Sequence, residues 1–132
     1  MPSLENIYLG NPNLKKANTP IEFTQEQILE FVACRHDPVY FAEKYIKIVT
    51  LDHGLQPFAM YDFQKKLIQN FHENRFNICK MPRQTGKSTT VVSYLLHYAV
   101  FNDNVNIAIL ANKASTARDL LGRLQLAYEN LP

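Results

Sequence analysis

The sequence predicts an α/β fold with a parallel sheet, in which a loop suited to phosphate joins a strand to a helix. Three observations lead to this class. Residues 76–81 form a short apolar run, and residues 89–101 form a longer segment that is apolar on nearly every side. Residues 105–111 follow as an apolar run rich in branched side chains, which is typical of buried parallel strands. Strand, loop, helix and strand in this order predict a right-handed βαβ unit.

The loop before the helix has the residue types that bind nucleotide phosphates. Gly86 permits close approach of the backbone, Lys87 can reach the β and γ phosphates, and the Ser88 hydroxyl can ligate Mg²⁺. The helix N-terminus adds N–H groups and a positive dipole end. The strict pattern G-x-x-x-x-G-K-[ST] fails because Met81 replaces its first glycine, so an ordinary strand-to-helix turn stays the alternative. The predicted cofactor-binding residues of this loop are Pro82, Arg83, Gln84, Thr85, Gly86, Lys87, Ser88 and Thr89.

Residues 76–132 are therefore predicted to be the first part of a P-loop ATPase core whose sheet is incomplete. Only two segments have the pattern of strands, whereas a typical sheet has about five or six. Ser115 is expected to cap a final helix, which has apolar residues at helical spacing. Because the sequence stops just after this helix, we expect it to be the first part of a larger domain.

The segment before the core is predicted to be irregular at first and then helical. Residues 1–22 contain Asn-Pro and Thr-Pro pairs, which are typical of turns. Residues 23–75 are expected to form a helical part. Its first helix should begin at the string Thr24-Gln-Glu-Gln27, which has the form of a capping box. The apolar side of this helix is expected to contain Ile28, Leu29 and Val32.

A second and a third helix are predicted in the same part. Asp37 followed by Pro38 supplies an N-cap and a first helical residue for the second helix. Its aromatic residues are expected to pack in the protein rather than to stack on bases. Asp62 is expected to cap the third helix. The aromatic residues of the second helix are Tyr40, Phe41 and Tyr45. The apolar face of the third helix contains Phe63, Leu67, Ile68 and Phe71.

Gln64 lies on the third helix and is expected to face the protein. It precedes Ile68 by one helical turn, so the two side chains share a side. An inward amide needs hydrogen-bond partners. Two kinds of partner fit its donor and acceptor: nearby backbone groups, or the edge of an adenine base.

Composition gives little support to several other classes of protein. There are 14 Lys and Arg against 12 Asp and Glu. This balance is nearly neutral, so net charge does not predict nucleic-acid binding. Cys34 and Cys79 lie far apart in apolar segments, so two buried reduced thiols are expected. No apolar run reaches the roughly 18 residues of a membrane span, and the chain is expected to be soluble and intracellular. The histidines lack ligand spacing and are expected on the surface or in the core: His36, His53, His72 and His97.

Several strings of the sequence together resemble a known protein family. From about Phe23 to Pro132, the chain is similar to the N-terminal ATPase region of large terminase subunits from tailed bacteriophages of the myovirus type. This resemblance implies a RecA-like P-loop NTPase that couples ATP hydrolysis to DNA translocation into an empty capsid. The strings that carry it are Arg83-Gln-Thr-Gly-Lys-Ser88, Tyr61-Asp-Phe-Gln64, Asp37-Pro-Val-Tyr-Phe41 and Leu51-Asp-His-Gly54.

The resemblance also implies roles and partners. The family's loop commonly lacks the first glycine and has arginine four residues before the lysine, as Arg83 and Lys87 show. The resemblance implies that Arg83 and Lys87 are catalytic, with Arg83 acting on the γ-phosphate. It also implies that Gln64 recognises adenine. The implied cofactors are ATP and Mg²⁺, with Ser88 as the metal ligand. The implied partners are double-stranded DNA, the portal protein and the small terminase subunit, in an oligomer in the host cytoplasm that docks on the procapsid.

The sequence departs from the family at two points. No apolar run that ends in Asp-Glu follows Lys87, so the Walker B aspartate and the catalytic glutamate are not evident. The carboxylates of the nuclease domain are not evident either. The chain is therefore expected to bind nucleotide without efficient turnover. Two alternatives stay open: a superfamily 2 helicase fragment, whose loop usually resembles A-x-T-G-x-G-K-T, and a non-catalytic nucleotide-binding interaction fragment.

Overall fold

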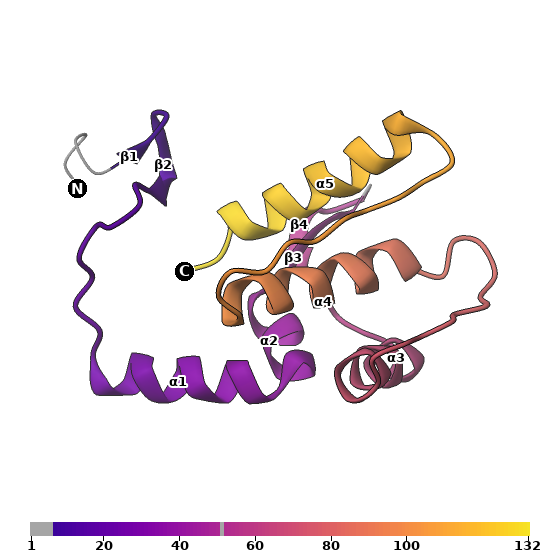
Figure 1. Ribbon diagram of the computed structural model, residues 1–132, viewed down its shortest axis with the longest axis horizontal. Helices are drawn as coiled ribbons and strands as arrows, with labels where there is room; N and C mark the ends of the chain where they lie inside the picture. Colours follow the sequence, from indigo (N-terminus) through magenta and orange to yellow (C-terminus); the bar gives the residue numbers. More distant parts are fainter. Residues whose placement is uncertain (1–6, 51) are drawn as a thin grey trace.

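The computed structural model describes residues 7–50 and 52–132 of the chain. In these residues it is a mixed α/β structure with five helices and two small antiparallel sheets (Figure 1). The first sheet pairs β1 (Ile7–Tyr8) with β2 (Asn11–Lys15), and the second pairs β3 (Lys47–Thr50) with β4 (Gly54–Pro57). The helices are α1 (Gln25–His36), α2 (Pro38–Tyr45), α3 (Asp62–Glu73), α4 (Lys87–Phe101) and α5 (Ala114–Glu129).

The first two helices begin at the predicted caps. The Thr24 hydroxyl accepts a hydrogen bond from the Gln27 N–H at 3.3 Å, and the Gln27 side chain accepts one from the Thr24 N–H at 2.9 Å. This is a complete capping box. The Asp37 carboxylate accepts from two N–H groups of the first turn of α2, at 2.9 and 3.0 Å, and Pro38 is the first helical residue. Both starts are confirmed.

The starts of the third and fifth helices differ from the predictions. The N-cap of α3 is Tyr61, one residue before the expected Asp62, because the Gln64 side chain reaches back and accepts from the Tyr61 N–H at 2.9 Å. The helix α5 begins at Ala114 with Lys113 as its N-cap, so Ser115 lies inside its first turn rather than capping it.

The hydrophobic core surrounds α4, which packs against α2, α3 and α5. Its centre contains Phe41, Ile68 and Leu96, each at most 3% exposed. Figure 1 shows α4 lying between α5 on one side and α2 and α3 on the other. The position of α4 matters for the candidate site, because residues 82–86 of the predicted phosphate loop lead directly into its first residue.

The two strands expected beside the phosphate loop are not formed in the described residues. Residues 76–81 and 105–111 are extended but pair with no strand, so the structure does not show a parallel sheet. Their apolar side chains are largely exposed: Phe76 is 83% exposed, Leu110 is 89% exposed and Ile78 is fully exposed. A buried parallel strand needs ladder partners and covered faces. Neither segment has them here.

Three further expectations also differ from the structure. The segment 1–22, expected to be irregular, contains the hairpin of β1 and β2, while its residues 1–6 lie outside the described part. Leu51, which belongs to one of the family strings, is likewise outside it. Cys34 is buried as expected, but Cys79 is exposed because the expected strand around it has no cover. The residues expected on the apolar side of α1 are about half exposed: Ile28 is 51%, Leu29 is 64% and Val32 is 44% exposed.

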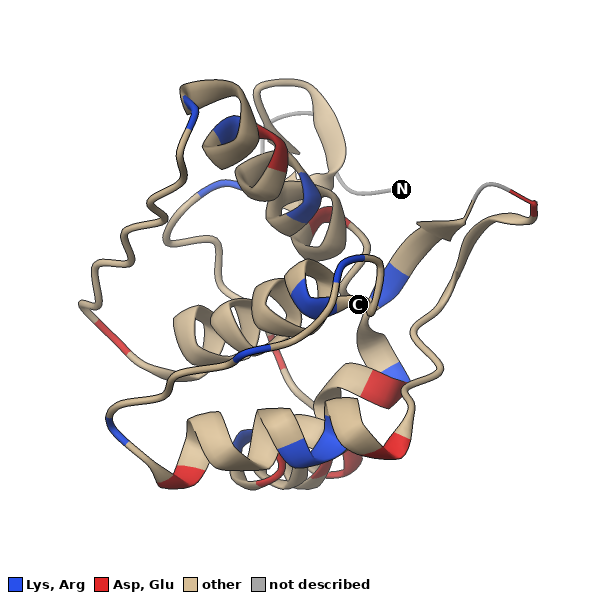
Figure 2. Cartoon of the chain, turned by 90° about the vertical axis from the view of Figure 1, so that its right-hand side faces the viewer, with Lys and Arg blue, Asp and Glu red and all other residues tan. Residues whose placement is uncertain are grey.

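Among the described residues, no helix combines the length and the apolar character that crossing a membrane requires. Figure 2 shows basic and acidic residues interspersed over the face that it presents. This mixture agrees with the nearly even balance of charges in the sequence.

Candidate nucleotide-binding site

The phosphate loop turns into α4 through Gly86. This residue is the N-cap of the helix and has φ 71° and ψ 18°, the left-handed conformation that glycine adopts without steric cost. Gln84, two residues earlier, also has a positive φ of 60°. A left-handed residue other than glycine costs roughly 1–2 kcal/mol, and such strain is concentrated at functional sites. The loop is therefore held in an unusual shape just before the helix.

Lys87 is the first residue of α4, and its side chain folds back across the loop. Its ammonium donates hydrogen bonds to the carbonyl oxygens of Met81 at 2.8 Å and Pro82 at 3.0 Å. The Thr85 hydroxyl donates to the same Pro82 oxygen at 3.1 Å. The ends of the loop are thus brought together around the lysine ammonium.

The electrostatics of this helix start favour an anion. The N-terminus of a helix carries a partial positive charge, and an acidic side chain in the first turn would offset it. The first turn of α4 has no acidic residue and begins with Lys87. A cation at this end is unfavourable by about 0.3–1 kcal/mol when it stands alone. A phosphate group would offset both charges.

Two other loop side chains face outward. The Ser88 side chain is exposed in the first turn of α4, so its hydroxyl is accessible to a metal ion. The Arg83 side chain is exposed on the outer part of the loop. Within residues 7–50 and 52–132, it has neither a hydrogen-bond nor an ion-pair partner. Arg83 therefore belongs to the loop, but no contact of its side chain within the described residues fixes its direction.

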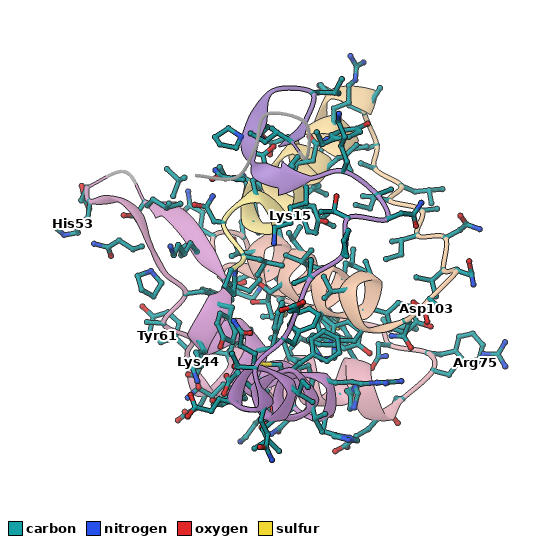
Figure 3. All side chains as sticks on the ribbon, turned by 90° about the vertical axis from the view of Figure 1, so that its left-hand side faces the viewer. Lys15, Lys44, His53, Tyr61, Arg75 and Asp103 are labelled. Carbon is teal, nitrogen blue, oxygen red and sulfur yellow. The ribbon has the colours of Figure 1, made fainter. Side chains whose placement is uncertain are left out.

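Gln64 is buried, as its helical spacing predicted, and its side chain contacts the predicted phosphate loop. It is 3% exposed. Its Oε1 accepts from the Tyr61 N–H at 2.9 Å, and its Nε2 donates to the Thr85 carbonyl oxygen at 3.2 Å. The inward orientation is confirmed, and both amide ends bond to backbone groups. The Tyr61 side chain beside it points away from the ribbon (Figure 3) and is 70% exposed.

A cavity of about 160 Å³ lies beside the start of α4, between this helix, the segment 105–111 and α5. It is lined mainly by apolar side chains, and Lys87 and Ser88 also contribute to its lining. Sites for small-molecule ligands usually enclose about 300–1,000 Å³. This cavity is therefore too small to enclose a nucleoside triphosphate.

The structure brings most of the predicted site residues together at one place. The amide of Gln64 bonds to the Thr85 carbonyl and lies against Gly86. The Lys87 side chain bonds to the Met81 carbonyl just before the same loop. The sequence did not predict that the Met81 carbonyl accepts a hydrogen bond from Lys87. Every residue type has a backbone carbonyl, so residue type does not identify such an acceptor. In the described ranges, no group of three or more His, Cys, Asp or Glu residues could hold a metal ion.

No model of a known protein family matches the sequence. The resemblance to large terminase subunits therefore rests on the four strings named above, at residues 37–41, 51–54, 61–64 and 83–88.

Proposed function

We propose that the chain binds ATP with Mg²⁺ at residues 82–89, as the ATP-binding part of a motor that moves DNA. The observation that carries the proposal is the start of α4. There, a left-handed Gly86 leads into a helix whose first residue is Lys87 and whose first turn has no acidic side chain. Backbone N–H groups, the helix dipole and an ammonium all favour a phosphate chain at this place.

Each loop residue has a distinct role in this proposal. The N–H groups around Gly86 bind the β-phosphate, and Lys87 exchanges its two carbonyl partners for the β and γ phosphates. Ser88 supplies one oxygen ligand to Mg²⁺. Arg83 moves from its exposed position to the γ-phosphate, where it would stabilise the charge that develops during phosphoryl transfer. The carboxylate that would activate water is not evident in the residues that follow Lys87.

The DNA-packaging part of the proposal is supported by the family resemblance. It assigns double-stranded DNA, the portal protein and the small terminase subunit as partners. It also assigns the extended segments 76–81 and 105–111 to a RecA-like parallel sheet. Their apolar, exposed side chains suit burial against further strands and helices.

The binding proposal is tested by isothermal titration of MgATP into the wild-type chain and into Lys87→Ala. We expect the variant to lose at least about tenfold in affinity, as for a lost charged hydrogen-bonding group. Lys66→Ala is the matched control, because Lys66 is an exposed lysine on α3. Equal affinities of the wild type and Lys87→Ala would contradict the proposal.

A second candidate is a nucleotide-binding interaction module without catalysis. The exposure of Phe76, Ile78 and Leu110 favours it, because exposed apolar residues can bind another protein. Turnover of ATP by this chain alone would exclude the interaction module. Absence of turnover agrees with both candidates, because no catalytic glutamate is evident after Lys87. The contact of Gln64 with the loop does not separate a terminase from a superfamily 2 helicase, since both place a glutamine before the loop.

A further inference from the structure

The side chain of Gln64 connects the first turn of α3 to the last loop residues before α4. Its Nε2 donates to the Thr85 carbonyl at 3.2 Å, while its Oε1 is held by the Tyr61 N–H. The amide also packs directly on Gly86. A Cβ atom added there would lie only 2.5 Å from Nε2. The absence of a side chain at Gly86 therefore makes room for the amide of Gln64.

This contact sets the direction of one peptide plane. The Thr85 carbonyl and the Gly86 N–H belong to the same planar peptide unit, and the unit is trans. In such a unit the C=O and N–H bonds point to opposite sides. When Gln64 holds the carbonyl toward α3, the Gly86 N–H points away from α3.

We propose that Gln64 is a positioning residue for phosphate binding. Its amide fixes the peptide unit between Thr85 and Gly86, so that the Gly86 N–H is presented to a phosphate group. This inference rests on the proposed nucleotide-binding function of the loop. It assigns Gln64 a contribution that is the same for any triphosphate, because the amide acts on the loop backbone and not on the base.

The hydrogen-bonding capacity of the amide agrees with this role. A glutamine amide has two N–H donors and a carbonyl with two lone pairs. In Gln64 one donor and one lone pair are bonded to the backbone of Thr85 and Tyr61. The side chain is also 3% exposed, so little of it is accessible to a base.

The experiment compares MgATP, MgGTP and Mg-tripolyphosphate by isothermal titration. The variant is Gln64→Met, which keeps the length of the side chain but removes both hydrogen bonds. We expect all three ligands to bind about tenfold more weakly, by similar factors, as for the loss of a buried hydrogen bond. Gln69→Met, at an exposed position of the same helix, should leave all three affinities unchanged. A loss confined to ATP would show that Gln64 reads adenine, and no loss would show that the amide is dispensable.

A measurement without ligand separates this inference from the proposed function. In ¹H–¹⁵N spectra, Gln64→Met should shift the Gly86 amide signal, whereas Gln69→Met should not.

In urea unfolding, Gly86→Ala should destabilise the wild type more than it destabilises Gln64→Ala. In the Gln64→Ala protein, the short alanine side chain at position 64 cannot clash with the Cβ atom that Gly86→Ala adds. The strain of alanine at a positive φ is present in both proteins, so the difference between them reports the clash. A wild-type chain that binds none of the three ligands would contradict the proposed function alone. Additive unfolding effects and an unmoved Gly86 signal would overturn the positioning role.

Discussion

Met81 occupies the position where a phosphate loop usually has glycine, and its backbone explains how a larger residue fits there. Glycine is required where φ is positive or where the backbone is closely approached. Met81 has a negative φ, and it contributes a carbonyl oxygen that accepts from Lys87 at 2.8 Å. Any residue can supply this carbonyl. The residues with positive φ lie later in the loop, at Gln84 and Gly86.

Met81→Gly should therefore leave the affinity for MgATP close to that of the wild type. It should lower the free energy of unfolding by about 1 kcal/mol, because glycine increases the conformational freedom of the unfolded chain. Isothermal titration and urea unfolding measure the two effects. Gly86→Ala is the contrasting variant and should weaken binding, because alanine is strained at φ 71°. Much tighter binding by Met81→Gly would show that the methionine obstructs the loop.

At the scale of elements, α4 is joined to α1 by a buried histidine. The Nε2 of His97 lies 2.9 Å from the Cys34 carbonyl oxygen, and the ring contacts Phe41 and Phe101. Its Nδ1 is buried and has no hydrogen-bond partner among the described residues. Because Nε2 must donate to the carbonyl, Nδ1 is the unprotonated nitrogen of the neutral ring. The His72 ring from α3 lies 6.1 Å away, between ring centroids.

The stability of the chain should therefore depend on pH through His97. Burial lowers the pKa of His97 from its ordinary value of 6.5, and the charge of His72 acts in the same direction. Because the unfolded chain binds this proton more readily, the free energy of unfolding should fall as pH falls below about 6.5. Urea unfolding between pH 8 and pH 5 measures this slope.

The matched variants for this pH effect are His97→Gln and His53→Gln. The glutamine introduced by His97→Gln can keep a donor toward the Cys34 carbonyl but does not titrate, so this variant should lose part of the slope. His53 is exposed, and His53→Gln should keep the slope. An unchanged slope in His97→Gln would assign the effect to other groups.

At the scale of the whole molecule, the unusual feature is the exposure of apolar segments that the sequence pattern assigns to a sheet. Ile78 is fully exposed, whereas Ile68 in α3 is completely buried. Both are isoleucines, but only one contributes to the core of this structure. The hydrophobic effect stabilises a side chain only when its surface is removed from water.

Ile78→Ala and Ile68→Ala should consequently differ in their effect on stability. Truncation of a fully buried isoleucine costs about 2–5 kcal/mol, and substitution at an exposed position usually changes stability by no more than about 0.5 kcal/mol. Urea unfolding of the two variants makes the comparison. A large loss in Ile78→Ala would show that residues 76–81 are paired and covered in solution, as the predicted parallel sheet requires.

The sequence alone determined the features that depend on neighbours within about one helical turn. The capping box at Thr24, the cap at Asp37 and the turn into a helix at Gly86 are all of this kind. Short-range hydrogen bonds and the freedom of glycine specify them. The inward side of Gln64 also followed from helical spacing.

Only the tertiary structure decided which apolar surfaces are covered and which groups are partners across the chain. Strand pairing and burial depend on segments far apart in sequence, so Phe76, Ile78 and Cys79 were expected inside but are exposed. The contact of Gln64 with Thr85 bridges two elements, and spacing within one helix cannot specify such a partner. Local hydrogen bonds determine where the helices begin. The packing of segments far apart in sequence determines which helix faces are buried and which residues they contact.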